Sequence, residues 1–180
     1  MSRIAIPTYE ASPAASLPLL DAVQAQLGVI PNLFRLVGAS PAALEGLLGL
    51  SGALNRTLDV RTRERIAIAV AETTGCDYCL SAHSYLALNL AGLDQEEVEA
   101  NRQGRSKDPR ADAVLIFAKR VVQTRGKVEN SMLEAIRLAG LSDAQIVEIV
   151  ANVAINVFTN LINNVAQTDI DFPVVRAGGL

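Results

Sequence analysis

The sequence predicts an all-α protein, a multi-helix bundle, and three observations support that prediction. Of the 180 residues 50% are hydrophobic but only 4% are aromatic, so small aliphatic side chains must fill the core, which suits close helix packing. Strand signals are scarce. Prolines, glycines and capping residues divide the chain into well-marked segments of helical length. A chain of this length is enough for one domain of ordinary size.

The first third of the chain is expected to form an arm and three helices. Pro7, Pro13 and Pro18 make residues 1–17 an arm rather than a regular element, because proline fixes φ and lacks a backbone donor. Glycines end the first two helices, and a serine caps the third. These three helices, each beginning at a proline, are expected over residues 18–27, 31–37 and 41–55.

The middle of the chain is expected to form two helices around a pair of cysteines. Residues 61–73 form the first of them, and the sequence Thr73-Thr74-Gly75 breaks it directly before Cys76. The second begins at or near Cys76 and ends at about Ala91, where Gly92 is a natural C-cap. Capping residues predict the starts of the remaining helices at Asp94, Asp108-Pro109, Ser131 and Ser142.

The last long helix carries a polar stripe. Glu148, Asn152, Asn156 and Asn160 recur every four residues, so they share one face. The other faces are apolar, which leaves two interpretations: a buried helix with a solvated asparagine edge, or a helix shared with a second subunit in an oligomer. The same polar residues interrupt the apolar run, so we do not expect a membrane span.

Charge and cysteine content narrow the functional classes. The net charge is −3 and no run of Lys or Arg occurs, which argues against nucleic-acid binding. The N-terminus lacks the apolar stretch of a secretory signal, so a cytoplasmic protein is expected. In that compartment two neighbouring cysteines are catalytic or metal-binding more often than structural.

Cys76, Cys79 and His83 form the candidate reactive group. They include both cysteines and the single histidine of the chain, and helical spacing places all three on one narrow face. The positive end of a helix stabilises a thiolate, and His83, one turn after Cys79, can accept its proton. A second cysteine two residues away can resolve a sulfenic acid by forming a disulfide.

Two glutamates compete to orient His83. Glu64 lies early in the preceding helix and Glu72 lies at its end. Because only a few residues join the two helices, they should pack antiparallel, which brings Glu64 closer to His83 than Glu72. The same residues leave an alternative open, in which two thiolates, the imidazole and Glu64 bind zinc. Ligands crowded on successive turns of one helix are not the usual zinc arrangement.

The spacing of Glu64, Cys76, Cys79 and His83 resembles that of the AhpD-like alkyl hydroperoxide reductases, a group within the carboxymuconolactone decarboxylase family. Flanking sequences are similar to the peroxidase-related branch of that family, and the likeness extends over residues 28–173. We therefore expect three parts. They are an N-terminal arm and first helix (1–27), an AhpD-like helical domain (28–173) and a C-terminal tail (174–180).

The resemblance implies a homo-oligomer, as a dimer, trimer or hexamer, and an alkylhydroperoxidase-like, peroxiredoxin-type antioxidant enzyme without haem, flavin or metal. Cys79 would be the peroxidatic thiol and Cys76 the resolving thiol, with Glu64 and His83 as a proton relay. The substrate would be a hydroperoxide. The reductant would be a dithiol, such as a protein-bound dihydrolipoamide or a thioredoxin-like protein. No nucleic acid or membrane partner is implied.

Tyr78 departs from the best-known member, which has a second histidine between its cysteines. A phenol titrates near pH 10 and is a poor base at neutral pH, so we expect Tyr78 to line the pocket. Three other functions remain as alternatives. They are a general disulfide reductase or redox sensor, a carboxymuconolactone-type decarboxylase and a zinc-binding interaction module. Decarboxylase members of the family lack the cysteine pair, which counts against the second.

Overall fold

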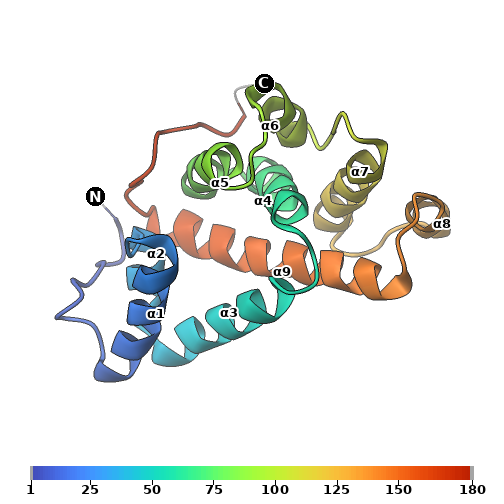
Figure 1. Ribbon diagram of the computed structural model, residues 1–180. Helices are drawn as coiled ribbons and strands as arrows, with labels where there is room; N and C mark the ends of the chain where they lie inside the picture. The colour runs from blue at the N-terminus through green and yellow to red at the C-terminus, as the bar shows by residue number, and fades with distance from the viewer. Residues whose placement is uncertain (1, 179–180) are drawn as a thin grey trace.

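The computed structural model describes residues 2–178, and within them the chain is helical without any strand (Figure 1), which confirms the all-α prediction. The outermost parts of the expected arm and tail, residues 1 and 179–180, lie outside the described residues. A short 3-10 turn, Ala14–Ser16, precedes the α-helices. These are α1 (Leu17–Leu27), α2 (Asn32–Val37), α3 (Pro41–Leu54), α4 (Val60–Thr74), α5 (Asp77–Asn89), α6 (Gln95–Arg102), α7 (Pro109–Thr124), α8 (Asn130–Leu138) and α9 (Asp143–Ala166).

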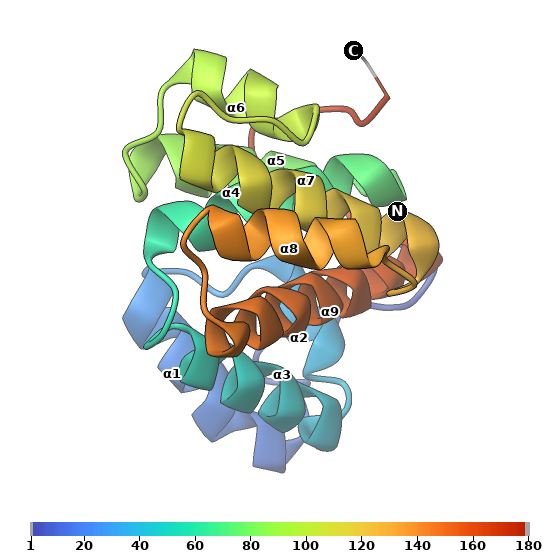
Figure 2. The ribbon, with the colours of Figure 1, turned by 90° about the vertical axis from the view of Figure 1, so that its right-hand side faces the viewer.

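Helix α9 is the central element of the molecule. It crosses the structure with α1, α2 and α3 on one side and α4, α5 and α7 on the other (Figures 1 and 2), and it contacts α2, α3, α4, α5 and α7. Its 24 residues are long and apolar enough to cross a membrane by length and composition alone. Helices pack against it on both sides here, so its apolar residues are explained in part by its place in the core.

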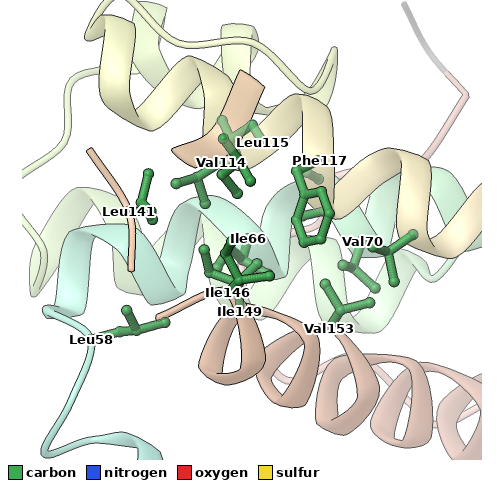
Figure 3. Packing of buried hydrophobic residues seen from close by; sticks show 14 residues of the cluster. Leu58, Ile66, Val70, Val114, Leu115, Phe117, Leu141, Ile146, Ile149 and Val153 are labelled. Atoms are coloured by element: carbon green, nitrogen blue, oxygen red, sulfur yellow. The ribbon is translucent and has the colours of Figure 1, made fainter. Parts of the chain in front are cut away.

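The largest hydrophobic cluster lies where α4, α7 and α9 meet (Figure 3). Leucine, isoleucine, valine and alanine fill it, and Phe117 is the one aromatic side chain among its buried members, as the low aromatic content predicts. Each of the larger side chains (leucine, isoleucine, valine and phenylalanine) contributes roughly 1.5–3 kcal/mol when it is fully buried. This packing holds α4 firmly between α7 and α9, and α4 is the helix that leads to the cysteines.

Most of the helix starts follow the predicted capping residues. Ser142 and Gln145 form a complete capping box at the start of α9. The start predicted at Ser131 is wrong, because α8 begins at Asn130 with Glu129 as its N-cap residue. The Glu129 side chain makes no capping hydrogen bond and instead forms an ion pair with Arg120 of α7.

The asparagine stripe on α9 faces inward, so the first of the two interpretations, a buried helix with a solvated asparagine edge, is wrong. Asn152, Asn156 and Asn160 are only 4%, 8% and 0% exposed. Their amides are paired inside the protein: Asn152 and Asn156 donate to carbonyls one turn earlier, and Asn160 donates to the Thr74 hydroxyl. The outward face of the helix is apolar instead, with Val147, Leu161 and Val165 each more than half exposed.

Candidate active site

A two-residue joint, Gly75 and Cys76, connects α4 to α5 and builds the site. Gly75 adopts φ 67°, a left-handed conformation that glycine tolerates without strain, and it ends α4. The backbone N–H of Cys76 then donates to the carbonyl of Ala71, which turns the chain back on itself. The two helices consequently pack against each other as an antiparallel pair, as predicted from the short connection.

Cys76 is the N-cap residue of α5, which begins one residue later than the earliest predicted start. Its Sγ accepts a hydrogen bond from the backbone N–H of Cys79 at 3.2 Å, a role that serine or aspartate often fills. Both cysteines are free thiols, and they are 0% and 2% exposed. The two side chains also hydrogen-bond to each other, so the sulfurs are neighbours at the positive end of a helix.

The two thiols differ in acidity. The hydrogen bond from the Cys79 side chain lowers the pKa of Cys76, and this effect outweighs burial, with further help from the Cys79 N–H and the charge of His83. Burial raises the pKa of Cys79, and the neighbouring Cys76 raises it further. When the pair loses a proton, that proton therefore leaves Cys76 first, and Cys79 keeps its own.

Glu64, and not Glu72, contacts His83. Glu64 Oε2 lies 2.8 Å from His83 Nδ1, whereas Glu72 pairs with Arg102 of α6 at 2.9 Å. Burial lowers the pKa of His83, but the charge and hydrogen bond of Glu64 outweigh burial, so this pKa is raised. Because Nδ1 is held by the carboxylate, Nε2 is the ring nitrogen that remains for proton exchange.

A cavity of about 470 Å³ opens onto this group. Cys79, His83 and Glu64 contribute to one wall, whereas Cys76 does not line it. The other walls are mainly apolar and come from helices far apart in the sequence. They include Leu33 and Phe34 of α2, Leu47 and Leu54 of α3, Ile155 of α9 and Phe172 near the C-terminus.

Tyr78 lies at the edge of this cavity and joins three segments. Its hydroxyl accepts a hydrogen bond from the Leu33 N–H at 3.1 Å, and its ring packs edge-on against Phe172 with centroids 5.9 Å apart. Burial raises the pKa of Tyr78 well above its usual value, so the phenol stays protonated. The tyrosine lines the pocket, as expected, and also holds α2 and the C-terminal segment beside α5.

Sequence reasoning missed the contribution of α9. Asn163 Nδ2 donates to Cys79 Sγ at 3.2 Å, and Asn152, Asn156 and Thr159 line the cavity. The four-residue spacing of Asn152 and Asn156 is a usable signal, but spacing alone does not decide whether that face points to solvent, to a second subunit or to the cavity.

The C-terminal segment packs over the other side of α5. Arg176 forms an ion pair with Asp77 at 2.6 Å, and the Ala177 N–H donates to the same carboxylate. Ser81 and Val175 exchange hydrogen bonds in both directions. Residues 174–178 of the expected tail therefore cover the cysteine helix.

The geometry does not favour a metal centre at this site. Among residues 2–178, no group of three or more His, Cys, Asp or Glu side chains is placed to hold a metal ion. Glu64 is engaged with Nδ1 of His83, and Cys79 Sγ faces the Asn163 amide, so the four candidate ligands do not converge on one point. The zinc alternative is therefore not supported.

Comparisons with known proteins agree with the fold. Residues 40–120 match the carboxymuconolactone decarboxylase family. An uncharacterized protein from Haemophilus influenzae is 54% identical over 37 residues, which is 21% of this chain, and the match spans only 33% of that protein.

Solved structures resemble nearly the whole chain. The alkylhydroperoxidase AhpD core of an uncharacterized peroxidase-related protein from Ralstonia eutropha JMP134 is 24% identical, with a TM-score of 0.84, and the match covers 94% of this chain and 92% of that one. A peroxidase-related protein from Silicibacter sp. TM1040 is 22% identical with a TM-score of 0.81, covering 93% and 91%. The debrominase Bmp8 is 21% identical with a TM-score of 0.78, again covering 93% and 91%.

The fold is thus that of an AhpD core protein, an all-helical architecture, and in this chain both thiols lie at the start of α5. The family match over residues 40–120 and the similarity of the whole fold to AhpD-like structures both support the sequence resemblance to AhpD-like proteins of the carboxymuconolactone decarboxylase family.

Proposed function

We propose that the protein is a thiol-dependent peroxidase that reduces organic hydroperoxides through a Cys76/Cys79 dithiol–disulfide cycle. One observation carries this proposal: Cys79, His83 and Glu64 together line a mainly apolar cavity. Cys76 contacts Cys79 but does not itself line the cavity. A nucleophile, a resolving thiol and a proton donor are thereby gathered around a space suited to an apolar organic group.

In the first step Cys79 must lose its proton. The Cys76 thiolate is the nearest acceptor, because the two side chains are already hydrogen-bonded, and His83 is the next group that can exchange this proton. The Cys79 thiolate attacks the terminal oxygen of the hydroperoxide, an S–O bond forms and the O–O bond breaks. The departing alkoxide takes a proton from the relay of His83 and Glu64 and leaves as an alcohol.

In the second step Cys76 resolves the sulfenic acid. Its thiolate attacks Sγ of Cys79, the S–S bond forms, the S–O bond breaks and the hydroxide leaves as water with one proton. In total one hydroperoxide and two thiols give one alcohol, one water and one disulfide. A dithiol reductant, either a protein-bound dihydrolipoamide or a thioredoxin-like protein, then restores both thiols, which suits a cytoplasmic location.

We further propose that the protein works as a homo-oligomer joined by the outward apolar face of α9. Val147, Leu161 and Val165 on this face are each more than half exposed. Exposed apolar residues gathered on one helix are typical of subunit contacts.

The test combines turnover and mass spectrometry. The wild-type protein should reduce cumene hydroperoxide with at least one reductant from a panel of dihydrolipoamide, thioredoxin and glutathione. One equivalent of hydroperoxide should convert the dithiol into an intramolecular disulfide, with a mass loss equal to two hydrogen atoms. Cys79→Ser is the matched control and should be inactive with every reductant. Disulfide exchange without hydroperoxide turnover would favour a reductase or redox sensor instead.

Reductive dehalogenation is a second candidate, favoured by the structural similarity to the debrominase Bmp8 and by the apolar cavity beside Cys79. A dithiol could supply the two electrons: an aryl bromide and two thiols would give the arene, bromide, a proton and the same disulfide. Bromide release from a brominated phenol or pyrrole tests this reaction. Including a carboxymuconolactone in the same substrate panel tests the decarboxylase alternative.

A further inference from the structure

We propose that Asn163 of α9 is a catalytic residue that stabilises negative charge on Cys79 Sγ by donating an amide hydrogen bond to it. This inference rests on the proposed function, in which Cys79 reacts as a thiolate. Asn163 Nδ2 lies 3.2 Å from Sγ, and the asparagine is 2% exposed, so water competes little for this contact. Hydrogen bonds from a neutral donor to a charged acceptor are among the stronger ones in proteins.

The other polar neighbours of the sulfur do not supply an equivalent donor. Thr159 also lies within hydrogen-bonding reach of Cys79, but its hydroxyl donates to the carbonyl of Asn156 at 3.0 Å. The Cys76 side chain is itself an acceptor in the pair. Among the residues that the structure describes, the side-chain N–H group that donates a hydrogen bond to Cys79 Sγ is the amide of Asn163.

The titratable groups around Cys79 come from α4, α5 and the joint between them. Cys76 lies in the joint, Tyr78 and His83 belong to α5, and Glu64 belongs to α4. The part of α9 that faces the cavity contributes only neutral side chains. A thiolate at Cys79 is therefore disfavoured by the neighbouring Cys76 and favoured by a protonated His83. Asn163 adds a neutral hydrogen-bond donor, which does not titrate.

Two further asparagines hold Asn163 in place. Asn160 Nδ2 donates to the Thr74 hydroxyl at 2.7 Å, and Asn164 Nδ2 donates to the Thr74 carbonyl at 3.2 Å. Thr74 is the last residue of α4, two positions before Cys76. These bonds fix α9 against the joint that carries the cysteines, so the amide between them is pre-organised toward the sulfur.

The amide is retained at a cost to stability. Asn163 Oδ1 is buried and has no hydrogen-bond partner among the described residues. An unpaired buried acceptor is unfavourable, and an aliphatic side chain here would avoid that penalty. An energetic cost beside a reacting atom is typical of functional residues. The reverse orientation of the amide would place Oδ1 on the sulfur and would favour the thiol over the thiolate.

The test measures the pH dependence of Cys79 alkylation by iodoacetamide in a Cys76→Ser background, where only one thiol reacts. Asn163→Leu should raise the midpoint by about one pH unit, which is a tenfold slower reaction at any pH well below it. Asn163→Asp, of nearly the same size, should raise the midpoint further, because a carboxylate repels the thiolate. This second variant decides the question if the leucine variant does not fold.

The matched control is Asn101→Leu. Asn101 is 0% exposed and donates to Glu97 on α6, so its loss removes an equally buried amide without touching the sulfur. Its alkylation midpoint should equal that of the parent. An unchanged or lowered midpoint in folded Asn163→Leu or Asn163→Asp would overturn the inference. Alkylation needs neither hydroperoxide nor reductant, so this result is independent of whether the proposed peroxidase activity is found.

Discussion

Glu64 Oε2 and His83 Nδ1 lie 2.8 Å apart, although nineteen positions separate the two residues in the chain. The contact joins the first half of α4 to the middle of α5, and it leaves the side chains 13% and 24% exposed. It fixes the imidazole in one orientation beside the cavity and gives the site its most readily titrated group.

Glu64→Gln should destabilise the protein in a pH-dependent way. The pKa of His83 is raised in the folded state, so the ion pair stabilises the fold below the unfolded-state pKa of histidine, and this contribution is lost as the pH rises through the folded-state pKa. We expect a loss of about 1 kcal/mol at pH 5 that shrinks toward pH 9, measured by urea unfolding. Glu72→Gln is the control: its partner Arg102 stays charged throughout, so its loss should be constant.

Cys76→Ser should leave a sulfenic acid on Cys79 after one equivalent of hydroperoxide. Without the resolving thiol, the oxidised sulfur has no neighbour with which to form a disulfide. Dimedone labelling followed by peptide mass spectrometry should place the adduct on Cys79. The Cys79→Ser variant should show little labelling, because Cys76 does not line the cavity. If dimedone instead labels Cys76 in the Cys79→Ser variant, Cys76 is the peroxidatic thiol and Cys79 the resolving thiol.

Tyr78→Phe should reduce stability more than activity. The hydroxyl accepts the Leu33 N–H, and its loss leaves a buried donor unpaired, which costs roughly 1–3 kcal/mol in chemical unfolding. The phenyl ring keeps the edge-on contact with Phe172. Because burial raises the pKa of this phenol, it is not a base at neutral pH, and turnover should stay within about threefold of wild type. A hundredfold loss in the folded variant would make the hydroxyl part of the chemistry.

Ile155→Phe should change substrate preference. Ile155 lines the cavity from α9, and a larger ring there takes space from the substrate. We expect kcat/KM for cumene hydroperoxide to fall roughly tenfold while that for hydrogen peroxide changes little. Ile162→Phe is the control, since Ile162 lies two turns later on α9 and does not line the cavity. Equal losses for both peroxides would mean that the cavity does not select substrates.

Leu161→Asp should reduce the size of the particle in solution. Leu161 is 57% exposed on the apolar face of α9, and a buried charge would oppose subunit contact there. Light scattering after gel filtration should show a smaller species than wild type. Val174→Asp, at another position that is 57% exposed, should leave the assembly intact. If the wild-type protein is itself monomeric in solution, the proposed subunit interface on α9 is wrong.

The sequence was most informative where local rules decide the structure. The glycine before Cys76 and the short connection predicted an antiparallel helix pair, and that geometry selected Glu64 over Glu72 as the partner of His83. It was least informative about the orientation of α9. Four-residue spacing shows that asparagines share a face, but the direction of that face depends on which helices pack around it, and Asn163 was therefore missed.

The two-residue joint of Gly75 and Cys76 brings together both thiols, the imidazole and its carboxylate, all within residues 64–83. The reacting groups are thus carried by a single helical hairpin, which also supplies much of the cavity wall, and the rest of the wall comes mainly from α1, α2, α3 and α9. Most of the cavity lining lies outside residues 64–83, so substitutions in α1, α2, α3 or α9 can change substrate preference without altering the redox pair.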